Sequence, residues 1–336
     1  MKQMYNTVKT LVSDAKSIVI IQPENPDGDS LASSLALESI LGSQEKTVTL
    51  FCAIDMPKYL RYINGWDRVT NEWDGKYDLA IIVDTSTEAL LQKALETPGI
   101  RHFLESHPVL VLDHHVEADE GNDLAFNHTL VQDDTAASTG ELLFLIAKEL
   151  GWTVDTETAE NLFISLAADT LGLTTPSVTL RSFETATELV RHGAVPAVIE
   201  LRRREMMRKP ADILEYKGKL IERIEYLCDG RLALIHIPWE DIQAYSDRYN
   251  PSVLVLDEMR LVEGVDVAIA IKTYPDGKLT GKIRANMPIA NQLAGYFGGG
   301  GHPYSAGFKI HESLEEVRRE LATAFNKLKV DDVTAA

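Results

Sequence analysis

Residues 17–41 read SIVIIQPENPDGDSLASSLALESIL, and this stretch decides the fold. The apolar run at 17–21 is typical of a buried strand, a polar loop with two prolines interrupts it, and the apolar positions from Leu31 onward favour a helix. Strand, loop and helix in this order make up one step of a parallel α/β sheet. The loop contains Asp27 and Asp29. By itself, Asp-Gly-Asp is commoner as a turn that caps a helix than as a metal site.

Further apolar runs alternate with helical patterns along the first half. They are TVTLFCA from Thr47, LAIIVD from Leu79 and VLVLD from Val109. We therefore expect an α/β fold built on a parallel sheet. From 135 to about 193 the pattern becomes helical, with Asp155 as the expected N-cap of one helix and Gly193 as a C-terminal stop.

Acidic and imidazole side chains follow several of these elements directly. Asp84 ends one apolar run, Asp113, His114 and His115 end another, and Asp169 closes the helical run SLAADT. Because the carboxyl ends of parallel strands share one edge of a sheet, we expect these side chains to converge. Oxygen-rich ligation with some imidazole suits Mn(II) or Mg(II). Two such cations activate water and hold phosphate without a covalent nucleophile.

The second half predicts a smaller mixed α/β domain. Strands are expected near RLALIHI, VDVAIAIKTY and LTGKIRA, with a hairpin turn at 274–277. A helical periodicity begins at Ala211, so the boundary between the two domains is expected near Lys209 and Pro210. The length of 336 residues agrees with two domains of roughly 100 to 200 residues each.

The amino-acid composition limits the kinds of molecule that the protein is expected to bind. Thirty-three Lys and Arg against 51 Asp and Glu give a net charge of −18, which disfavours long duplex nucleic acid. No apolar run approaches the roughly 20 residues that span a bilayer, and the N-terminus lacks the pattern of a secretory signal, so we expect no membrane partner and a cytoplasmic location. Cys52 and Cys228 lie far apart without metal-site spacing and are expected to be buried small residues.

The sequence resembles the DHH phosphoesterases, in particular the branch with a DHH-associated C-terminal domain. The resemblance is carried by NPDGDSLASSLAL, IIVDTS, LDHHV and AADT in the first half and by KIRAN and FGGGGHPYSAGF in the second. Within that branch the chain is most similar to the nanoRNase and pAp-phosphatase group. The resemblance implies a DHH catalytic domain (1–193), a helical linker (194–225) and a DHH-associated substrate-binding domain (226–330), with a substrate cleft between the domains.

The resemblance also implies roles for individual residues. The implied ligands of two divalent cations, Mn²⁺ or Mg²⁺, are Asp27, Asp29, Asp84, His114 and Asp169. His115 is expected to face the phosphate, and Asp113 to orient a neighbouring imidazole. The implied substrate contacts are Arg284, Gly298, Gly299, Gly300, Gly301 and His302, with the glycine amides close to an anionic group.

One position departs from the family pattern. The first family motif usually carries a histidine four residues before Asp27, where this chain has Pro23. Proline offers no side-chain ligand, so one cation site is expected to be weaker. Glu24 and water are the candidate substitutes.

The implied activity is hydrolysis of short oligoribonucleotides, of linear dinucleotides such as pApA, or of the phosphate of pAp, by a metal-activated water. A different possibility is a degenerate homologue that binds nucleotides but turns them over weakly because of Pro23. The motifs also leave open a cyclic dinucleotide phosphodiesterase and an inorganic pyrophosphatase or exopolyphosphatase. A homodimer is expected by analogy alone.

Overall fold

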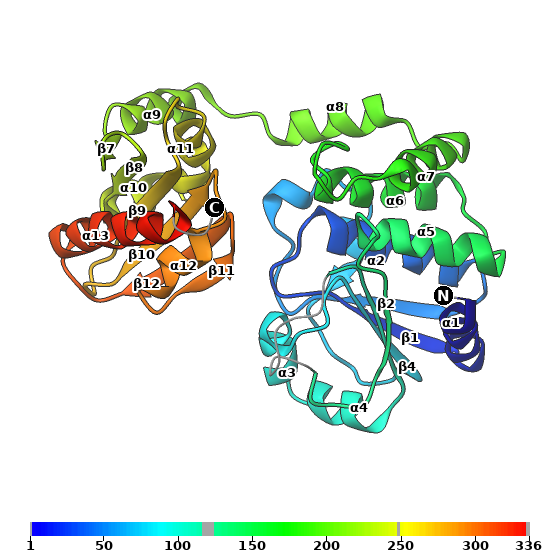
Figure 1. Ribbon diagram of the computed structural model, residues 1–336. Helices are drawn as coiled ribbons and strands as arrows, with labels where there is room; N and C mark the ends of the chain where they lie inside the picture. The colour runs from blue at the N-terminus through cyan, green and yellow to red at the C-terminus, as the bar shows by residue number, and fades with distance from the viewer. Residues whose placement is uncertain (1, 116–123, 247–248, 334–336) are drawn as a thin grey trace. The chain divides into compact units, whose positions relative to one another are not determined.

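The computed structural model describes residues 2–115, 124–246 and 249–333, and the chain divides into two compact units, 1–208 and 209–336 (Figure 1). The helix α8 (Pro196–Met206) places Ile199 in the core of the first unit. The helix α9 (Ala211–Ile221) places Ile213, Tyr216 and Leu220 in a core of the second unit. Each unit therefore has its own hydrophobic core.

A six-stranded parallel sheet forms the centre of the first unit, in the order β3-β2-β1-β4-β5-β6. Its strands are β1 (Ser17–Ile21), β2 (Thr47–Phe51), β3 (Val69–Thr70), β4 (Leu79–Val83), β5 (Val109–Asp113) and β6 (Thr129–Gln132). The strand β1 lies between β2 and β4, so the connections on its two sides run in opposite directions. Open parallel sheets bind ligands at the carboxyl ends of the strands at such a point.

Helices cover both faces of this sheet (Figure 1). One core contains residues of α1 (Lys2–Asp14), α2 (Gly28–Gly42), α5 (Thr139–Leu150) and α6 (Thr156–Asp169). The core on the opposite face contains residues of α3 (Gln92–Glu96) and α4 (Ile100–Ser106). Burial on both faces explains why β4 and β5 are nearly continuous apolar runs. The remaining elements of this unit are α7 (Leu180–Arg191) and the short 3₁₀ helices η1 (Lys58–Leu60), η2 (Trp66–Arg68) and η3 (Glu88–Leu90).

The second unit is built on a six-stranded mixed sheet in the order β11-β12-β10-β9-β8-β7. Its strands are β7 (Glu225–Leu227), β8 (Leu232–Ile237), β9 (Val267–Thr273), β10 (Leu279–Ala285), β11 (Gly300–His302) and β12 (Ser305–Ile310). Among the described strands of this second sheet, only β8 and β9 pair in parallel. Its other helices are α10 (Trp239–Tyr245), α11 (Pro251–Arg260), α12 (Ala290–Gly295) and α13 (Leu314–Val333).

The predicted α/β class, with a parallel sheet followed by a mixed one, is confirmed. The Asp155 side chain caps α6 by accepting from the Thr158 amide at 2.8 Å, and a turn at 274–278 joins β9 to β10, both as predicted. Cys52 is buried as predicted, whereas Cys228 is half-buried, and neither forms a disulfide. Among the described residues, no helix is both long and apolar enough to cross a membrane.

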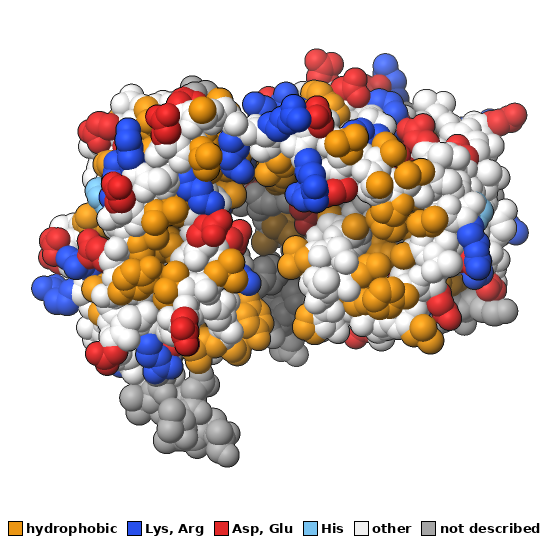
Figure 2. Space-filling model, turned by 90° about the horizontal axis from the view of Figure 1, so that it is seen from above, with side chains coloured by type: hydrophobic (Ala, Val, Ile, Leu, Met, Phe, Trp, Pro, Cys, Tyr) orange, Lys and Arg blue, Asp and Glu red, His pale blue; other side chains and the backbone are white. Residues whose placement is uncertain are grey.

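Large apolar side chains also stand exposed on the first unit. Hydrophobic side chains gather on the face seen in Figure 2. On α7 and α8 the exposed ones include Leu180, Phe183, Val198 and Leu201. The apolar area of these side chains is exposed on the surface, because they are not buried in the cores of the unit.

Candidate functional site

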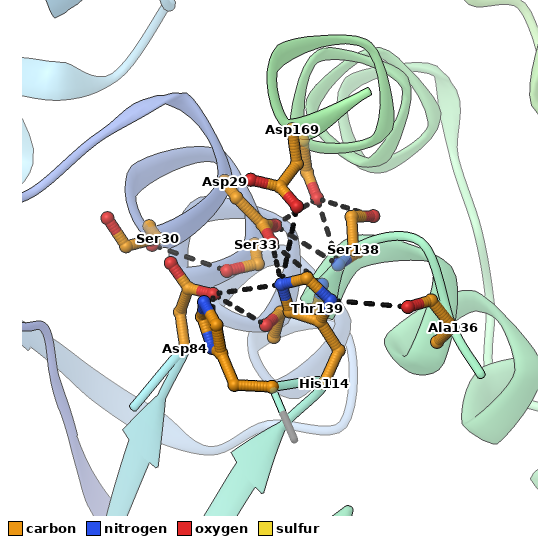
Figure 3. Close-up of polar contacts among 12 residues, drawn as sticks. Asp29, Ser30, Ser33, Asp84, His114, Ala136, Ser138, Thr139 and Asp169 are labelled. Atoms are coloured by element: carbon orange, nitrogen blue, oxygen red, sulfur yellow. Dashed lines mark hydrogen bonds and ion pairs between the residues drawn. The ribbon is translucent and has the colours of Figure 1, made fainter. Parts of the chain in front are cut away.

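Three carboxylates surround one imidazole where the strands of the parallel sheet end (Figure 3). Asp84 follows β4, His114 follows β5, Asp29 lies in the first turn of α2, and Asp169 is the last residue of α6. The His114 Nε2 atom lies 3.5 Å from Asp29 Oδ2, 3.7 Å from Asp84 Oδ1 and 3.5 Å from Asp169 Oδ2. We call these four residues the carboxylate–histidine cluster.

The orientation of His114 suits a metal ligand. Its Nδ1 lies 3.2 Å from the Ala136 carbonyl oxygen, so a proton on Nδ1 leaves the Nε2 lone pair directed at the carboxylates. Nε2 is buried and has no hydrogen-bond partner among the described residues. Two sets of ligand atoms lie within 4.8 Å of one another: Asp84, His114 and His115, and Asp29, His114 and Asp169. An orphaned buried nitrogen among hard oxygen ligands fits a divalent cation.

Asp29 is buried and held by the start of α5. Its Oδ2 accepts from the Thr139 amide at 2.8 Å, while Oδ1 accepts from the Gly140 amide at 3.3 Å and from the Ser165 hydroxyl. Burial raises the pKa of Asp29 to about 6, with His114 opposing the change and Asp169 adding to it. The carboxylate is therefore oriented for ligation but costly to ionise without a cation.

Asp84 combines burial with an unusual backbone conformation. Its φ is +63°, in the left-handed region that costs free energy for residues other than glycine, although Asp tolerates it better than most. The Thr139 hydroxyl donates to Asp84 Oδ1 at 3.0 Å. Burial and the charge of Asp29 raise the pKa of Asp84 well above its ordinary value. A strained backbone at a buried carboxylate is typical of a functional position.

Glycines bring the helices that carry these acids close together. A Cβ on Gly28 would lie 2.5 Å from the Ala168 Cβ, and a Cβ on Gly140 would lie 2.0 Å from the Ser165 hydroxyl oxygen. Any larger residue would push α2 or α5 away from α6. The small residues beside the acids therefore have a packing function in the assembly of the cluster.

His115 and Asp113 form a pair next to the cluster. The two residues are linked by a 2.7 Å contact between His115 Nδ1 and Asp113 Oδ1. This hydrogen bond raises the pKa of His115, although the partial burial of the ring acts in the opposite direction. Burial favours the neutral form of Asp113, but the hydrogen bond and charge of His115 outweigh it and lower the pKa of that carboxyl. The side chain of His115 is 49% exposed, so its ring is accessible to a ligand.

The Asp27 side chain caps a helix and does not lie among the converging ligand atoms of the described residues. Its Oδ1 accepts from the amides of Asp29 and Ser30 at 2.9 and 3.0 Å and so caps α2. It belongs to neither set of converging ligand atoms in the described chain. The helix-capping interpretation of Asp-Gly-Asp therefore applies to Asp27, and its role as a metal ligand stays a prediction.

Pro23 and Glu24 supply no ligand to either set in the described part of the chain. The Glu24 carboxylate accepts from the Lys93 amide at 2.8 Å, near the start of α3. The Pro23 carbonyl oxygen accepts from the buried Cys52 thiol at 3.6 Å. Glu24, the candidate substitute for the missing histidine, is thus engaged elsewhere.

The predicted substrate-binding residues lie in the second unit, 209–336. Arg284 is half-buried on β10 and donates to the Ser305 hydroxyl, while the side chain of His302 lies outside the described part of the structure. The amides of Gly298 and Gly299 donate to the Gly295 and Ala294 carbonyls, so these two amides already have partners. A Cβ on Gly299 would lie 2.2 Å from the Gly307 carbonyl oxygen. Close packing on β12 thus explains Gly299, and the substrate contacts of all four glycines stay predictions.

Thr139 and Ser165 were not anticipated. Thr139 contacts both Asp29 and Asp84, and Ser165 donates to Asp29 from α6. The available signals were the Ser-Thr-Gly sequence at a helix start and the position of Ser165 four residues before Asp169, on the same helical face.

Residues 17–170 match the family described as DHH family, N-terminal domain. The chain carries a DHH family domain. It is 23% identical to the bifunctional oligoribonuclease and PAP phosphatase NrnA of Bacillus subtilis (strain 168), over 91% of this chain and 93% of the relative. It is 26% identical to the protein of the same name from Thermus thermophilus, over 91% of each chain. An exopolyphosphatase-related protein from Bacteroides fragilis shares the fold, with a TM-score of 0.86, 21% identity, and coverage of 98% of this chain and 97% of the other.

Proposed function

We propose that this DHH protein is a metal-dependent phosphoesterase that hydrolyses short oligoribonucleotides, linear dinucleotides such as pApA, or the phosphate of pAp. The observation that carries the proposal is the buried, unpartnered Nε2 of His114 facing the carboxylates of Asp29, Asp84 and Asp169. Two similar proteins are named oligoribonuclease and PAP phosphatase, which supports this substrate class.

Asp29, Asp84, His114 and Asp169 would hold divalent cations, Mn²⁺ or Mg²⁺, with Asp27 as a further candidate. When bound, such cations lower the pKa of water and neutralise phosphate charge. Thr139 keeps two of the carboxylates in place, since its amide contacts Asp29 and its hydroxyl contacts Asp84. Preorganised carboxylates lose little side-chain freedom when a ligand binds.

His115 would act directly on the phosphate group. Its Nδ1 faces Asp113, which fixes the ring and favours the imidazolium form. The Nε2 proton of that imidazolium would bind a phosphate oxygen or pass to the leaving oxygen as the P–O bond breaks. Asp113 then serves as a positioning residue, because it acts through His115.

A second candidate is a nucleotide-binding homologue with weak turnover. Pro23 provides no side-chain ligand, and Glu24 is hydrogen-bonded to the Lys93 amide. These two observations favour an incomplete second cation site.

A substrate panel tests the proposal. We expect hydrolysis of pApA or pAp with Mn²⁺ or Mg²⁺, loss of hydrolysis in EDTA, and slower cleavage of a 20-nucleotide RNA. Cyclic di-AMP and pyrophosphate in the same panel test for cyclic dinucleotide phosphodiesterase and pyrophosphatase activity. Asp84→Ala should abolish turnover, whereas Asp67→Ala, which removes an exposed acid, should not. Undiminished hydrolysis in excess EDTA would refute the metal mechanism, and tight binding without hydrolysis would favour the second candidate.

A cytoplasmic location and a homodimer are also part of the proposal. The exposed apolar side chains of α7 and α8, such as Leu180 and Leu201, provide a surface that a second copy would cover. Light scattering on Leu201→Glu and wild-type protein would test the dimer.

A further inference from the structure

Gln22 is a buried polar residue at the carboxyl end of a central strand. It directly follows β1, and only 1% of its surface is exposed. Neither its side-chain oxygen Oε1 nor its side-chain nitrogen Nε2 has a hydrogen-bond partner among the described residues. Burying an amide without a partner costs free energy, so a native protein keeps such a group where it can bind an ion or a water molecule.

The alternation of β1 directs Gln22 to the face of the sheet that carries the carboxylate–histidine cluster. Ile18 and Ile20 enter the core that contains α2, α5 and α6, whereas Val19 and Ile21 enter the opposite core. The backbone N–H of Gln22 still donates to a carbonyl oxygen at the end of β2, at 3.0 Å, so the strand geometry extends to this residue. The Gln22 side chain therefore points to the face covered by α2 and α6, the two helices that contribute carboxylates to the cluster.

The strand register places Gln22 beside Asp84. Ile21 pairs with Ile82 of β4, so the same parallel register brings Gln22 next to Val83, which immediately precedes Asp84. With neighbouring strands about 4.8 Å apart and a rise of about 3.3 Å per residue, the Cα atoms of Gln22 and Asp84 are about 6 Å apart. Across this separation a glutamine amide and an aspartate carboxylate can bind the same ion.

The two residues that follow Gln22 are engaged in other contacts. Pro23 has no ligand atom in its side chain, and its carbonyl oxygen accepts from the Cys52 thiol at 3.6 Å. The Glu24 carboxylate accepts from the Lys93 amide at 2.8 Å. Among the described residues 22–24, Gln22 is thus the one that combines a buried side chain with an unpartnered side-chain oxygen.

We propose that the amide oxygen of Gln22 is a ligand of the cation held by Asp84. The inference rests on the proposed function for the presence of that cation. Amide oxygens suit Mn²⁺ and Mg²⁺, and a neutral ligand adds no negative charge to a site that already contains three carboxylates. A six-coordinate cation that retains water molecules can accept this oxygen and, in a Pro23→His variant, an imidazole as well.

Calorimetric titration of Mn²⁺ into the metal-free, full-length protein tests the proposal. Gln22→Met keeps the length of the side chain and removes its oxygen, so the dissociation constant of one Mn²⁺ site should rise about 10-fold or more. The same variant should raise the Tm of the metal-free protein by about 2 °C or more, because an apolar group replaces an unpartnered buried amide. A glutamine with a purely structural role would give the reverse result, a lower Tm with unchanged Mn²⁺ affinity.

Two further variants serve as controls. Gln22→Glu retains an oxygen at the same place, so Mn²⁺ should bind at least as tightly as in the wild-type protein, while the buried charge should lower the Tm of the metal-free protein at pH 7.5. Asn161→Leu removes another buried, unpartnered amide of the described chain, about 12 Å along α6 from Asp169. It should leave Mn²⁺ affinity unchanged.

The inference is overturned if Gln22→Met binds Mn²⁺ as tightly as the wild-type protein or is less stable than it in the metal-free form. It is also overturned if Gln22→Glu loses affinity, if Asn161→Leu weakens binding as much as Gln22→Met, or if the wild-type protein binds no Mn²⁺.

Hydrolysis of pApA in the same preparations separates this inference from the proposed function. Mn²⁺-dependent hydrolysis by the wild-type protein, with an unchanged dissociation constant in Gln22→Met, overturns only the role of Gln22. Weaker Mn²⁺ binding by Gln22→Met, in a protein whose wild-type form hydrolyses no substrate, overturns only the phosphoesterase and leaves Gln22 as a ligand.

Discussion

In the absence of bound cations, the first unit should be less stable at neutral pH than in mild acid. One cause is Asp29, whose pKa burial raises from 3.8 to about 6. A difference of about 2 in pKa corresponds to about 3 kcal/mol of unfolding free energy. Because the folded-state pKa is raised, this stability is present below pH 4 and is lost as the pH rises through 6. Proton linkage predicts that about 1.4 kcal/mol of this unfolding free energy is lost between pH 5.0 and 7.5. The raised pKa values of Asp84 and His115 act in the same direction.

Urea unfolding followed by tryptophan fluorescence would measure this change. Trp66, Trp73 and Trp152 lie in the first unit and Trp239 in the second, so Trp239→Phe restricts the signal to the first unit. In EDTA, the unfolding free energy should be at least about 1.4 kcal/mol higher at pH 5.0 than at pH 7.5. Mn²⁺ at 100 times its dissociation constant should add about 2.7 kcal/mol at pH 7.5 and less at pH 5.0, where protons compete for the carboxylates.

Asp84→Asn provides the control for this reasoning. Asn tolerates the left-handed backbone at this position and removes one charge from the cluster, so the difference between the two pH values should shrink. Metal-free wild-type protein that becomes more stable from pH 5.0 to pH 7.5 would refute the argument that burial of these carboxylates opposes their ionisation.

Three further predictions concern packing, metal affinity and substrate binding. Gly140→Ala should destabilise the first unit by about 1–3 kcal/mol in the same urea assay, because the new Cβ would overlap Ser165; a change below about 0.5 kcal/mol would mean that α5 moves easily. Pro23→His should tighten Mn²⁺ binding in calorimetric titrations, and equal stoichiometry and affinity in both proteins would show that another group already fills the position. Arg284→Ala should raise KM for pApA by about 10-fold or more with little change in kcat, since Arg284 lies in the unit that does not contain the carboxylate–histidine cluster. An effect confined to kcat would assign Arg284 to the chemical step.

Long apolar strands and their following acids could be predicted because their signals are local. The central strands β1, β4 and β5 are buried on both faces, so their composition alone distinguishes them. Short strands at or near the sheet edges, such as β3 and β11, consist of two and three residues and carry no such pattern. Their formation depends on pairing with β2 and β12.

Some residues of the site could likewise be predicted from the local sequence, whereas the roles of others depend on contacts between distant segments. Asp29, Asp84, His114 and Asp169 follow from strand ends and family motifs, and the structure brings them together. The capping hydrogen bonds of Asp27 and the contact of Glu24 with Lys93 depend on backbone geometry, which residue types alone do not specify. Thr139 contacts Asp29 across 110 positions of sequence, so no local pattern identifies it.

The contact between Gly28 and Ala168 has an evolutionary consequence. The two residues are 140 positions apart, yet a single added methyl group at position 28 would already overlap the alanine. A side chain at position 28 is then tolerated only when position 168 becomes glycine, and a residue larger than alanine at 168 cannot be compensated at 28, because glycine is already the smallest residue. Among descendants of a common ancestor, side-chain volumes at 28 and 168 should vary in opposite directions, and that covariation would mark lineages in which the helices α2 and α6 keep their spacing.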